Sequence, residues 1–364
     1  MSRIVIDARE SGTSTGRYVD KLIEHLHDLQ PKHQIIILTR PQRTDFIATI
    51  APTFTVIQTP FKEFTFGEQL GFRRQLNGLA PDLVHFSMVQ QPVLYRGRVV
   101  TTMHDLITIR FRNPDKNAVV FWIKQRIYRW VNKRVAHKSA RVIVPTEYVK
   151  KDVASFTHIK PEKIAVTLES GDRISDKPEA TKELAGKQFI MYIGRPTPHK
   201  NLGRLIDAFA ALQQTRPDLY LVLAGKKDAN YRRHEQTVQE RGIQNVIFTD
   251  FITDGQLRWL YEHCTAYVFP SLSEGFGLPG LEAMAHGAPV VSSNATCLPE
   301  VYGDAAYYFD PLDTEDMAAK LGEVLDDPIL REDLVAKGRE QIKKYSWKRM
   351  ARQTLDIYEQ VLGR

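Results

Sequence analysis

Cysteine is scarce in this chain, and long apolar runs are missing. Among 364 residues there are two cysteines, Cys264 and Cys297, too few for a disulfide framework and not at a metal-ligand spacing. No apolar run approaches the roughly 18 residues that cross a bilayer. The N-terminal stretch MSRIVIDARE has an apolar core too short for a signal peptide, and it is typical of a first strand. The sequence predicts a protein of the reducing cytoplasm.

Three motifs of cofactor and metal sites are also missing. The chain contains no D-x-D triplet, so we expect no metal ion. The loop SGTSTG, in which Gly12 and Gly16 lead into a helix-like stretch, is a candidate anion site, but it lacks the G-x-G-x-x-G spacing of dinucleotide sites. Lys200 follows His199 where a phosphate loop has glycine.

Positive charge is concentrated in one segment. The chain has a net charge of +7, but residues 96–151 hold fourteen Lys or Arg against three acids, a net +11. Residues 110–138 mix these cations with aromatic residues, which is typical of a helix on an anionic membrane surface. A core helix with a solvated basic face is the alternative. No nucleic-acid module is recognisable, so we expect no nucleic-acid partner.

Short apolar runs alternate with helix-like stretches along the whole chain. The runs RIVIDA, QIIIL, DLVHF and ARVIVPT are typical of buried parallel strands, and FIMYIG, LYLVLAG, AYVFPS and APVVSS repeat the pattern. The pattern predicts the α/β class, with two doubly wound parallel-sheet domains. We expect one domain over 1–170 completed by a C-terminal helix over 345–364, a linker over 171–187, and a second domain over 188–344.

Polar residues that directly follow predicted strands are the candidate site residues, because ligands bind beyond the carboxyl ends of parallel strands. His104 and Asp105 follow one strand and suit a polar catalytic group with its partner, or a helix cap. Arg195 and Lys200 follow another and suit a diphosphate, although two such cations are often only solvated surface.

The stretch SLSEGFGLPGLEAMAHGAP places Glu274 and Glu282 eight positions apart. In one unbroken helix the two acids would lie about 12 Å apart along the axis. The intervening glycines and Pro279 break that helix and let both carboxylates approach one ligand. A carboxylate accepts two hydrogen bonds, so the pair suits the vicinal hydroxyls of a ribose and a hexose. A glycosidase pair, a metal site and a purely structural role remain open for these acids.

Together these segments resemble the retaining glycosyltransferases of family 4, which have the two-domain GT-B fold with a cleft between Rossmann-like domains. The resemblance spans almost the full length. It lies in SEGFGLPGLEAMAHGAPVVSSN with its E-x7-E spacing, IGRPTPHKNLGRLIDAF, TTMHDL, VIVPTEYVKKDV and the C-terminal YSWKRMARQTLDIYEQVL. The spelling EGFGLPGLEA and the HDL context are most similar to mannosyltransferases that use GDP-mannose.

The resemblance implies a role for each matching residue. Arg195 and Lys200 would neutralise the donor diphosphate, Glu282 would bind the ribose, and Glu274 would contact the donor sugar. His104 would lie near the reacting side of the sugar, supported by Asp105. The implied catalytic set is His104, Asp105, Glu274, Arg195 and Lys200; the implied donor-binding set is Gly16, Arg195, Lys200, Asp250, Phe251, Glu274, Gly275, Phe276, Gly277, Leu278 and Glu282.

Two segments depart from the family pattern. The glycine loop is usually shorter than SGTSTG, which leaves no assigned role for Gly12. The turn between the domains usually reads N-G-V-D and here reads LESGDR, so no role is transferred to it.

The sequence thus predicts a retaining, metal-independent glycosyltransferase that moves a hexose to a hydroxyl of a glycan or lipid-linked glycan. Mannose, donated by GDP-mannose, is the sugar that the resemblance favours. The resemblance implies front-side attack in which the leaving diphosphate takes the acceptor proton. We expect a cytoplasmic enzyme, peripheral on the inner face of the cell membrane if residues 110–138 contact it. A UDP-sugar-dependent enzyme, a non-catalytic binding protein, a glycosidase and an epimerase or phosphorylase of the same fold are the alternatives.

Overall fold

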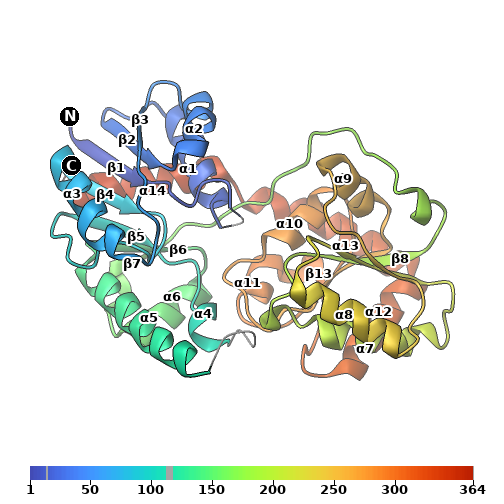
Figure 1. Cartoon of the computed structure of the whole chain (residues 1–364). Helices are drawn as coiled ribbons and strands as arrows, with labels where there is room; N and C mark the ends of the chain where they lie inside the picture. The colour runs from blue at the N-terminus through green and yellow to red at the C-terminus, as the bar shows by residue number, and fades with distance from the viewer. Residues whose placement is uncertain (14, 112–117, 364) are drawn as a thin grey trace. The chain divides into compact units, whose positions relative to one another are not determined.

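The chain folds into two compact units (Figure 1). The computed structural model describes residues 1–13, 15–111 and 118–363, and of residues 118–120 it describes the backbone alone. The first unit comprises Met1–Ile109, Lys116–Glu169 and Ser346–Arg364, and the second comprises Ser170–Tyr345 with Arg110–Asp115.

The first unit contains a parallel sheet with the strand order β3-β2-β1-β4-β5-β6-β7. Most of its strand residues are buried, because helices cover both faces of such a sheet. The chain reverses its direction of sheet growth between β1 and β4, which is the doubly wound arrangement. The strands are β1 (Arg3–Asp7), β2 (Gln34–Thr39), β3 (Thr55–Gln58), β4 (Leu83–Phe86), β5 (Val99–Thr102), β6 (Arg141–Val144) and β7 (Ile164–Val166).

The helices between these strands follow from the apolar periodicity of the sequence. In α1, Tyr18, Leu22 and Leu26 are buried on one face, as their spacing predicts. The helical segments of this part are α1 (Arg17–Asp28), η1 (Pro41–Arg43), α2 (Thr44–Ile50), the π-helical η2 (Glu68–Phe72), α3 (Arg73–Leu79), α4 (Ile107–Arg110), α5 (Ala118–Lys138), α6 (Glu147–Thr157) and η3 (Pro161–Lys163).

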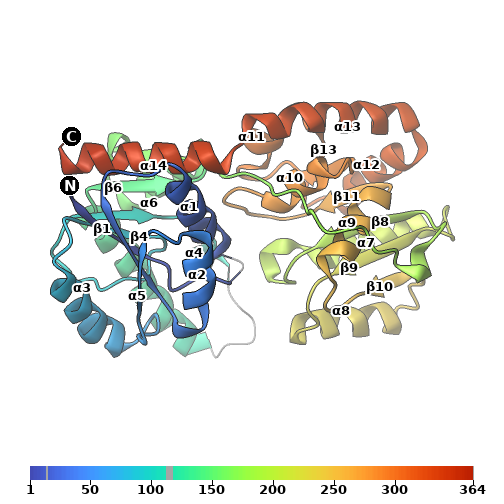
Figure 2. The same ribbon diagram turned by 90° about the horizontal axis from the view of Figure 1, so that it is seen from above.

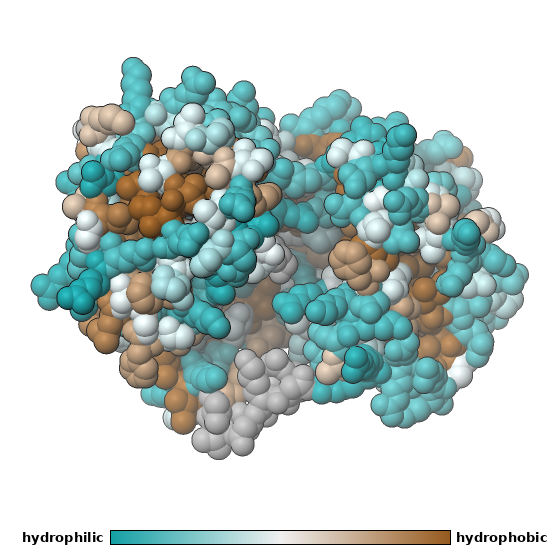
Figure 3. Space-filling view, turned by 45° about the horizontal axis from the view of Figure 1, so that its top comes forward, coloured by the Kyte–Doolittle hydropathy of each residue, from teal (hydrophilic) through white to brown (hydrophobic). Residues whose placement is uncertain are grey.

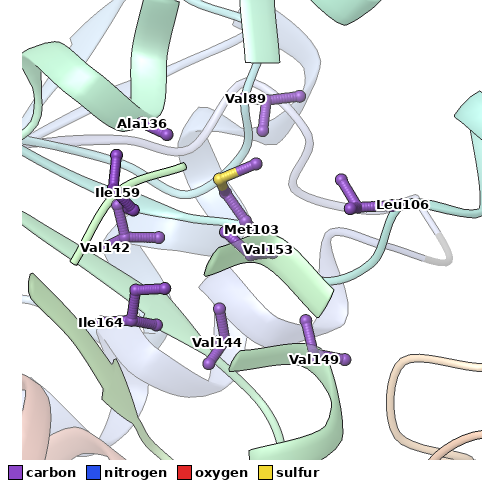
Figure 4. Packing of buried hydrophobic residues seen from close by; sticks show 10 residues of the cluster. All are labelled: Val89, Met103, Leu106, Ala136, Val142, Val144, Val149, Val153, Ile159 and Ile164. Atoms are coloured by element: carbon purple, nitrogen blue, oxygen red, sulfur yellow. The ribbon is translucent and has the colours of Figure 1, made fainter. Parts of the chain in front are cut away.

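Branched aliphatic side chains pack between α6 and the edge of the first sheet (Figure 4). Val142 and Val144 of β6 and Val149 and Val153 of α6 are at most 1% exposed, and they enclose Met103. The Thr146 side chain caps α6 by accepting a hydrogen bond from the Val149 backbone N–H. This packing fixes the end of β5, from which residues 103–105 project.

The helix α14 (Trp347–Leu362) belongs to the first unit although it follows the second unit in sequence. It packs beside α1, as Figure 2 also shows. Glu359 Oε1 lies 2.8 Å from His33 Nε2, and the Tyr358 hydroxyl lies 2.5 Å from His85 Nδ1 inside the unit. The C-terminal helix α14 therefore completes the core of the first unit.

The second unit repeats the doubly wound plan in the order β10-β9-β8-β11-β12-β13, and its pairs are all parallel. Its switch point lies between β8 and β11. The strands are β8 (Phe189–Ile193), β9 (Tyr220–Ala224), β10 (Val246–Phe248), β11 (Ala266–Phe269), β12 (Val290–Ser293) and β13 (Ala306–Phe309). The structure confirms the predicted GT-B architecture of two Rossmann-like parallel-sheet domains.

Helices cover the second sheet as they cover the first. The α9 helix begins at a capping box, in which Thr253 and Gln256 satisfy each other's backbone N–H groups. The helical segments are η4 (Lys182–Leu184), η5 (Pro198–Lys200), α7 (Leu202–Gln213), α8 (Ala229–Glu240), α9 (Asp254–His263), α10 (Leu278–Ala285), α11 (Leu298–Tyr302), η6 (Gly303–Ala305), α12 (Thr314–Asp326), α13 (Pro328–Gln341) and η7 (Ile342–Lys344).

Candidate functional site

The loop that follows β8 carries the two predicted diphosphate-binding cations. Arg195 is exposed, and its side chain makes no hydrogen bond or ion pair to the part of the chain that the structure describes. Lys200 closes the short turn η5 and is followed by Asn201, whose backbone is left-handed with φ 61°. The buried Asn201 amide donates to the carbonyls of Pro270 and Pro311, at 3.1 and 2.7 Å. These bonds tie the loop that follows β8 to the loops that follow β11 and β13.

Lys200 and Glu274 form an ion pair at the switch point of the second sheet. Lys200 Nζ lies 2.6 Å from Glu274 Oε1, and the two side chains are 19% and 10% exposed. The backbone of Glu274 is also anchored, because its N–H donates to the Thr296 hydroxyl at 3.0 Å. Two residues that the sequence places in separate motifs, after β8 and after β11, are thus in direct contact.

The glycine-rich break beside Glu274 opens α10. Gly277 has φ 99°, a conformation that favours glycine, and no side chain caps the N-terminus of α10. A Cβ atom on Gly277 would lie 2.5 Å from the Tyr302 hydroxyl oxygen, and one on Gly280 would lie 2.3 Å from it. Tyr302 donates to the Gly277 carbonyl from beneath the loop. Packing against this tyrosine is therefore sufficient to explain both glycines.

The second predicted acid, Glu282, lies on α10 and is 9% exposed, as is Glu274. The remaining predicted loop residues, Gly275, Phe276 and Leu278, surround the start of the same helix. Phe276 is 5% exposed and packs edge-on against Tyr345. The centre of the loop is consequently well packed, and Glu274 in the loop and Glu282 on α10 are both largely buried.

Two residues of the predicted donor-binding set, Asp250 and Phe251, lie after β10. Asp250 has φ 65°, and its Oδ1 accepts the Lys227 backbone N–H at 2.9 Å. This bond connects the loops that follow β9 and β10. Phe251 is 84% exposed, so its ring is available to a ligand.

His104 follows β5 in the first unit and is held by groups that the sequence did not suggest. Its Nδ1 lies 3.1 Å from Glu169 Oε1, and its Nε2 lies 3.1 Å from the Ser87 carbonyl oxygen. Burial lowers the pKa of His104, but hydrogen bonding and charge attraction from Glu169, with Asp105 and the Ser87 carbonyl, outweigh it and raise the pKa above its usual value. Asp105 Oδ1 accepts the Ile107 backbone N–H at 2.8 Å, so it also caps α4.

Gly16, the predicted anion-loop glycine, immediately precedes α1. A Cβ atom there would lie 1.8 Å from the Glu10 carbonyl oxygen, so the loop itself excludes any side chain. Gly12 has φ 79°. Ser14, between them, lies outside the described residues.

An ionic cluster that sequence reasoning missed lies at the end of β1. The Arg9 side chain is 1% exposed, and its Nη2 lies 2.7 Å from Asp7 Oδ2 while its Nη1 lies 2.9 Å from Glu68 Oε1. The guanidinium also lies 4.0 Å from the centre of the Phe72 ring. The alternating charges of IDARE after the first apolar run were the available signal. For Glu169, the partner of His104, the signal in the sequence was weaker: it is an acid that follows the apolar run of β7.

Comparison with known proteins gives both halves of the chain a family. Residues 15–167 match the model of Glycosyltransferase Family 4, and residues 174–341 match that of Glycosyl transferases group 1.

Two curated relatives and one solved structure are similar over long stretches. O-antigen chain mannosyltransferase B of Escherichia coli is 33% identical over 280 residues, 72% of this chain and 70% of that protein. MMP alpha-(1->4)-mannosyltransferase of Mycolicibacterium hassiacum is 31% identical over 276 residues, 73% of this chain and 66% of that protein. Sucrose-phosphate synthase from Thermosynechococcus elongatus superposes with a TM-score of 0.79 at 19% identity, with all of both chains covered. The chain belongs to the family 4 glycosyltransferases, and it is a glycosyltransferase of the GT-B fold.

Proposed function

We propose that this enzyme transfers mannose from GDP-mannose to a hydroxyl of a glycan or lipid-linked glycan, with retention and without a metal ion. The contact between Lys200 and Glu274 carries the proposal, because it joins a cation suited to phosphate with an acid suited to sugar hydroxyls. The names of the two curated relatives, both mannosyltransferases, support mannose as the sugar.

The Lys200–Glu274 pair suits a donor that carries both a phosphate and a sugar. Without donor, each side chain neutralises the other at 2.6 Å. When a diphosphate approaches Lys200, it competes for the ammonium and leaves the Glu274 carboxylate to accept hydrogen bonds from hydroxyls. Arg195 adds a second, exposed cation to the same loop. Two cations on one loop would supply the charge that a metal ion supplies elsewhere, which supports the metal-independent mechanism.

The proposed reaction breaks the bond between the anomeric carbon and the diphosphate oxygen. The acceptor oxygen bonds to that carbon on the same face, and the acceptor proton passes to the departing diphosphate, which leaves as GDP. Arg195 and Lys200 stabilise the negative charge on the leaving group. Removing one such electrostatic contact typically raises a barrier by about 3–4 kcal/mol, a loss of roughly 10²–10³ in turnover.

Nucleotide binding and sugar transfer test the proposal together. We expect GDP to raise the melting temperature more than UDP or ADP, because ligand binding stabilises the folded state by RT ln(1 + [L]/Kd). Transfer from GDP-mannose should persist in EDTA and give the α-anomer by NMR. Arg195→Ala and Lys200→Ala should each lower turnover roughly 10²-fold or more, whereas the surface variant Lys337→Ala should not. A larger shift with UDP would favour the UDP-sugar alternative, and loss of transfer in EDTA would contradict metal independence.

We also propose that α5 brings the enzyme to an anionic membrane surface where lipid-linked acceptors lie. Ile123, Ile127 and Trp130 are spaced along one helical stripe and are 48%, 56% and 55% exposed. Large apolar side chains on a helix are normally turned inward, and these lie among the cations of the +11 segment. Residues 112–117 of the predicted surface lie outside the described residues. None of the described helices is both long enough and apolar enough to cross a bilayer.

A neighbouring loop extends the same apolar surface. Phe64 and Phe66 are 68% and 90% exposed, and the Phe64 ring lies 6.2 Å from the ring of Tyr128 on α5. Glu68 Oε2 accepts the Phe64 backbone N–H at 3.0 Å, and Glu68 is anchored by the buried Arg9. On the face shown in Figure 3, hydrophobic and hydrophilic side chains are interspersed along the lower edge of the first unit. The backbone at Phe64 is therefore tied to a buried ion pair, while the Phe64 ring stays exposed.

Vesicle sedimentation tests this surface. The protein should bind vesicles that contain anionic phosphatidylglycerol, and binding should weaken with salt because it is partly electrostatic. Ile127→Ser should reduce binding, whereas Ile329→Ser, which changes an isoleucine 76% exposed in the second unit, should not. Equal binding to neutral vesicles, or equal losses in both variants, would contradict the proposal.

A further inference from the structure

The His104 ring is bonded on both sides to hydrogen-bond acceptors. Nε2 lies 3.1 Å from the Ser87 carbonyl oxygen, which cannot donate, and Nδ1 lies 3.1 Å from Glu169 Oε1. A neutral imidazole carries one N–H and one bare nitrogen, so by itself it can serve only one of these two neighbours.

Counting protons resolves the arrangement. The Ser87 carbonyl requires a proton on Nε2, so the contact between Nδ1 and Glu169 needs a second proton. That proton lies either on the imidazole, giving an imidazolium and a carboxylate, or on the carboxyl group. A free histidine holds a proton about two pH units more tightly than a free glutamate does. The pair is therefore an imidazolium bonded to a carboxylate.

The surroundings preserve this ion pair. The His104 and Glu169 side chains are 16% and 7% exposed, so water screens their attraction weakly. Asp105 adds negative charge near the ring, and from α1 the uncharged Tyr18 meets it edge-on, with ring centres 4.8 Å apart. His85 of β4 also acts on the ring electrostatically but is itself uncharged, because burial and the charge of His104 lower the pKa of His85 to about 3.

We propose that Glu169 is a positioning residue that keeps His104 doubly protonated, so that His104 serves the transfer reaction as a charged hydrogen-bond donor and not as a general base. This inference rests on the proposed function and adds a residue from the turn LESGDR, whose spelling departs from the family pattern. Glu169 follows β7 and Ser87 follows β4, so both partners lie at the carboxyl edge of the first sheet, on either side of the strand β5 that carries His104.

The chemical consequence concerns the acceptor proton. An imidazolium has no lone pair, so His104 cannot remove the proton of the attacking hydroxyl. That proton must leave with the diphosphate, as front-side attack requires. While Nδ1–H stays on Glu169, Nε2–H can exchange the Ser87 carbonyl for an oxygen of the substrate. Glu169 therefore sets the positive charge of the ring and leaves Nε2–H as the group that can donate to a ligand.

Histidine ¹⁵N NMR tests the protonation state without any need for catalysis. In the full-length protein, the His104 signals, assigned by their loss in His104→Gln, should show both nitrogens protonated at pH 7.5. In Glu169→Gln they should show a neutral ring at that pH, whereas Glu162→Gln, an exposed acid of the same segment, should match the wild type. A neutral His104 in the wild type would overturn the proposal.

The pH profile of kcat/KM gives the second readout. The alkaline limb should move toward acid by at least one pH unit in Glu169→Gln, and Glu169→Asp should restore part of that shift because the charge returns on a shorter side chain. An unmoved profile, with only a uniform loss of rate, would mean that Glu169 is merely structural. If no donor sugar is transferred by the wild type, the proposed function fails, while the NMR result still decides the state of His104.

Discussion

Removing the Lys200 ammonium should destabilise the second unit even before any donor is present. Lys200→Met leaves the Glu274 carboxylate, 90% buried, without its partner at 2.6 Å. Breaking a buried ion pair by removing one partner typically costs about 3–5 kcal/mol. Because Lys200 keeps 19% of its side chain exposed, we expect the low end, about 3 kcal/mol. In a unit of this size that lowers the melting temperature by roughly 6–12 °C.

A double variant separates the charge from the packing. Lys200→Met with Glu274→Gln removes both charges, so most of the lost stability should return, while transfer activity should not. Scanning calorimetry of donor-free wild type, both single variants and the double variant gives the coupling energy of the pair. Lys337→Met is the control; its side chain is 39% exposed on α13 and pairs with the exposed Asp333, so this variant should leave the melting temperature within about 1–2 °C. An unchanged melting temperature in Lys200→Met, or a double variant as unstable as the sum of the singles, would refute this reasoning.

Two further predictions follow from buried groups. Gly280→Ala should lower the free energy of unfolding by about 1–3 kcal/mol, because its Cβ would lie 2.3 Å from the Tyr302 hydroxyl oxygen. Adding Tyr302→Phe should recover part of that loss. Full stability of the single variant would contradict the close contact. Stability should also fall as pH drops from about 7 toward 5, because unfolded histidine takes up a proton near pH 6.5 whereas His85, whose pKa is lowered to about 3 by burial and by the charge of His104, does not. Urea unfolding should show a shallower pH dependence in His85→Gln, and identical slopes would exclude His85 as the cause.

The fold was predictable because the two signals that specify it, apolar runs and their alternation with helical stretches, are local in the sequence. Apolar runs such as QIIIL and LYLVLAG mark buried strands, and the alternation with helical stretches specifies parallel sheets whatever the partners are. The positions of Arg195, Lys200 and Glu274 after strands were enough to place them at the carboxyl edge of the second sheet. Their direct contact followed from the doubly wound order, which puts β8 beside β11.

The contacts that hold the site together were not predictable, because they join residues far apart in sequence. Glu169 lies 65 positions from His104, and nothing in LESGDR marks it as a partner of that ring. The glycines of the 275–280 break predicted only an interruption of the helix, whereas Tyr302 also packs against Gly277 and Gly280. A glycine pattern reports that space is needed, and it does not report which atom fills that space.

The return of α14 to the first unit has a consequence for biosynthesis. The second unit is formed mainly by one continuous stretch, Ser170–Tyr345, and can fold as soon as that stretch leaves the ribosome. The first unit cannot, because the helix that packs on α1 and meets the buried His85 is made after residue 345. Until then the side of α1 that packs on α14 lacks its partner, so the N-terminal unit is synthesised first and completed last. A nascent chain stalled before α14 should accordingly be protease-resistant in its second unit and sensitive in its first.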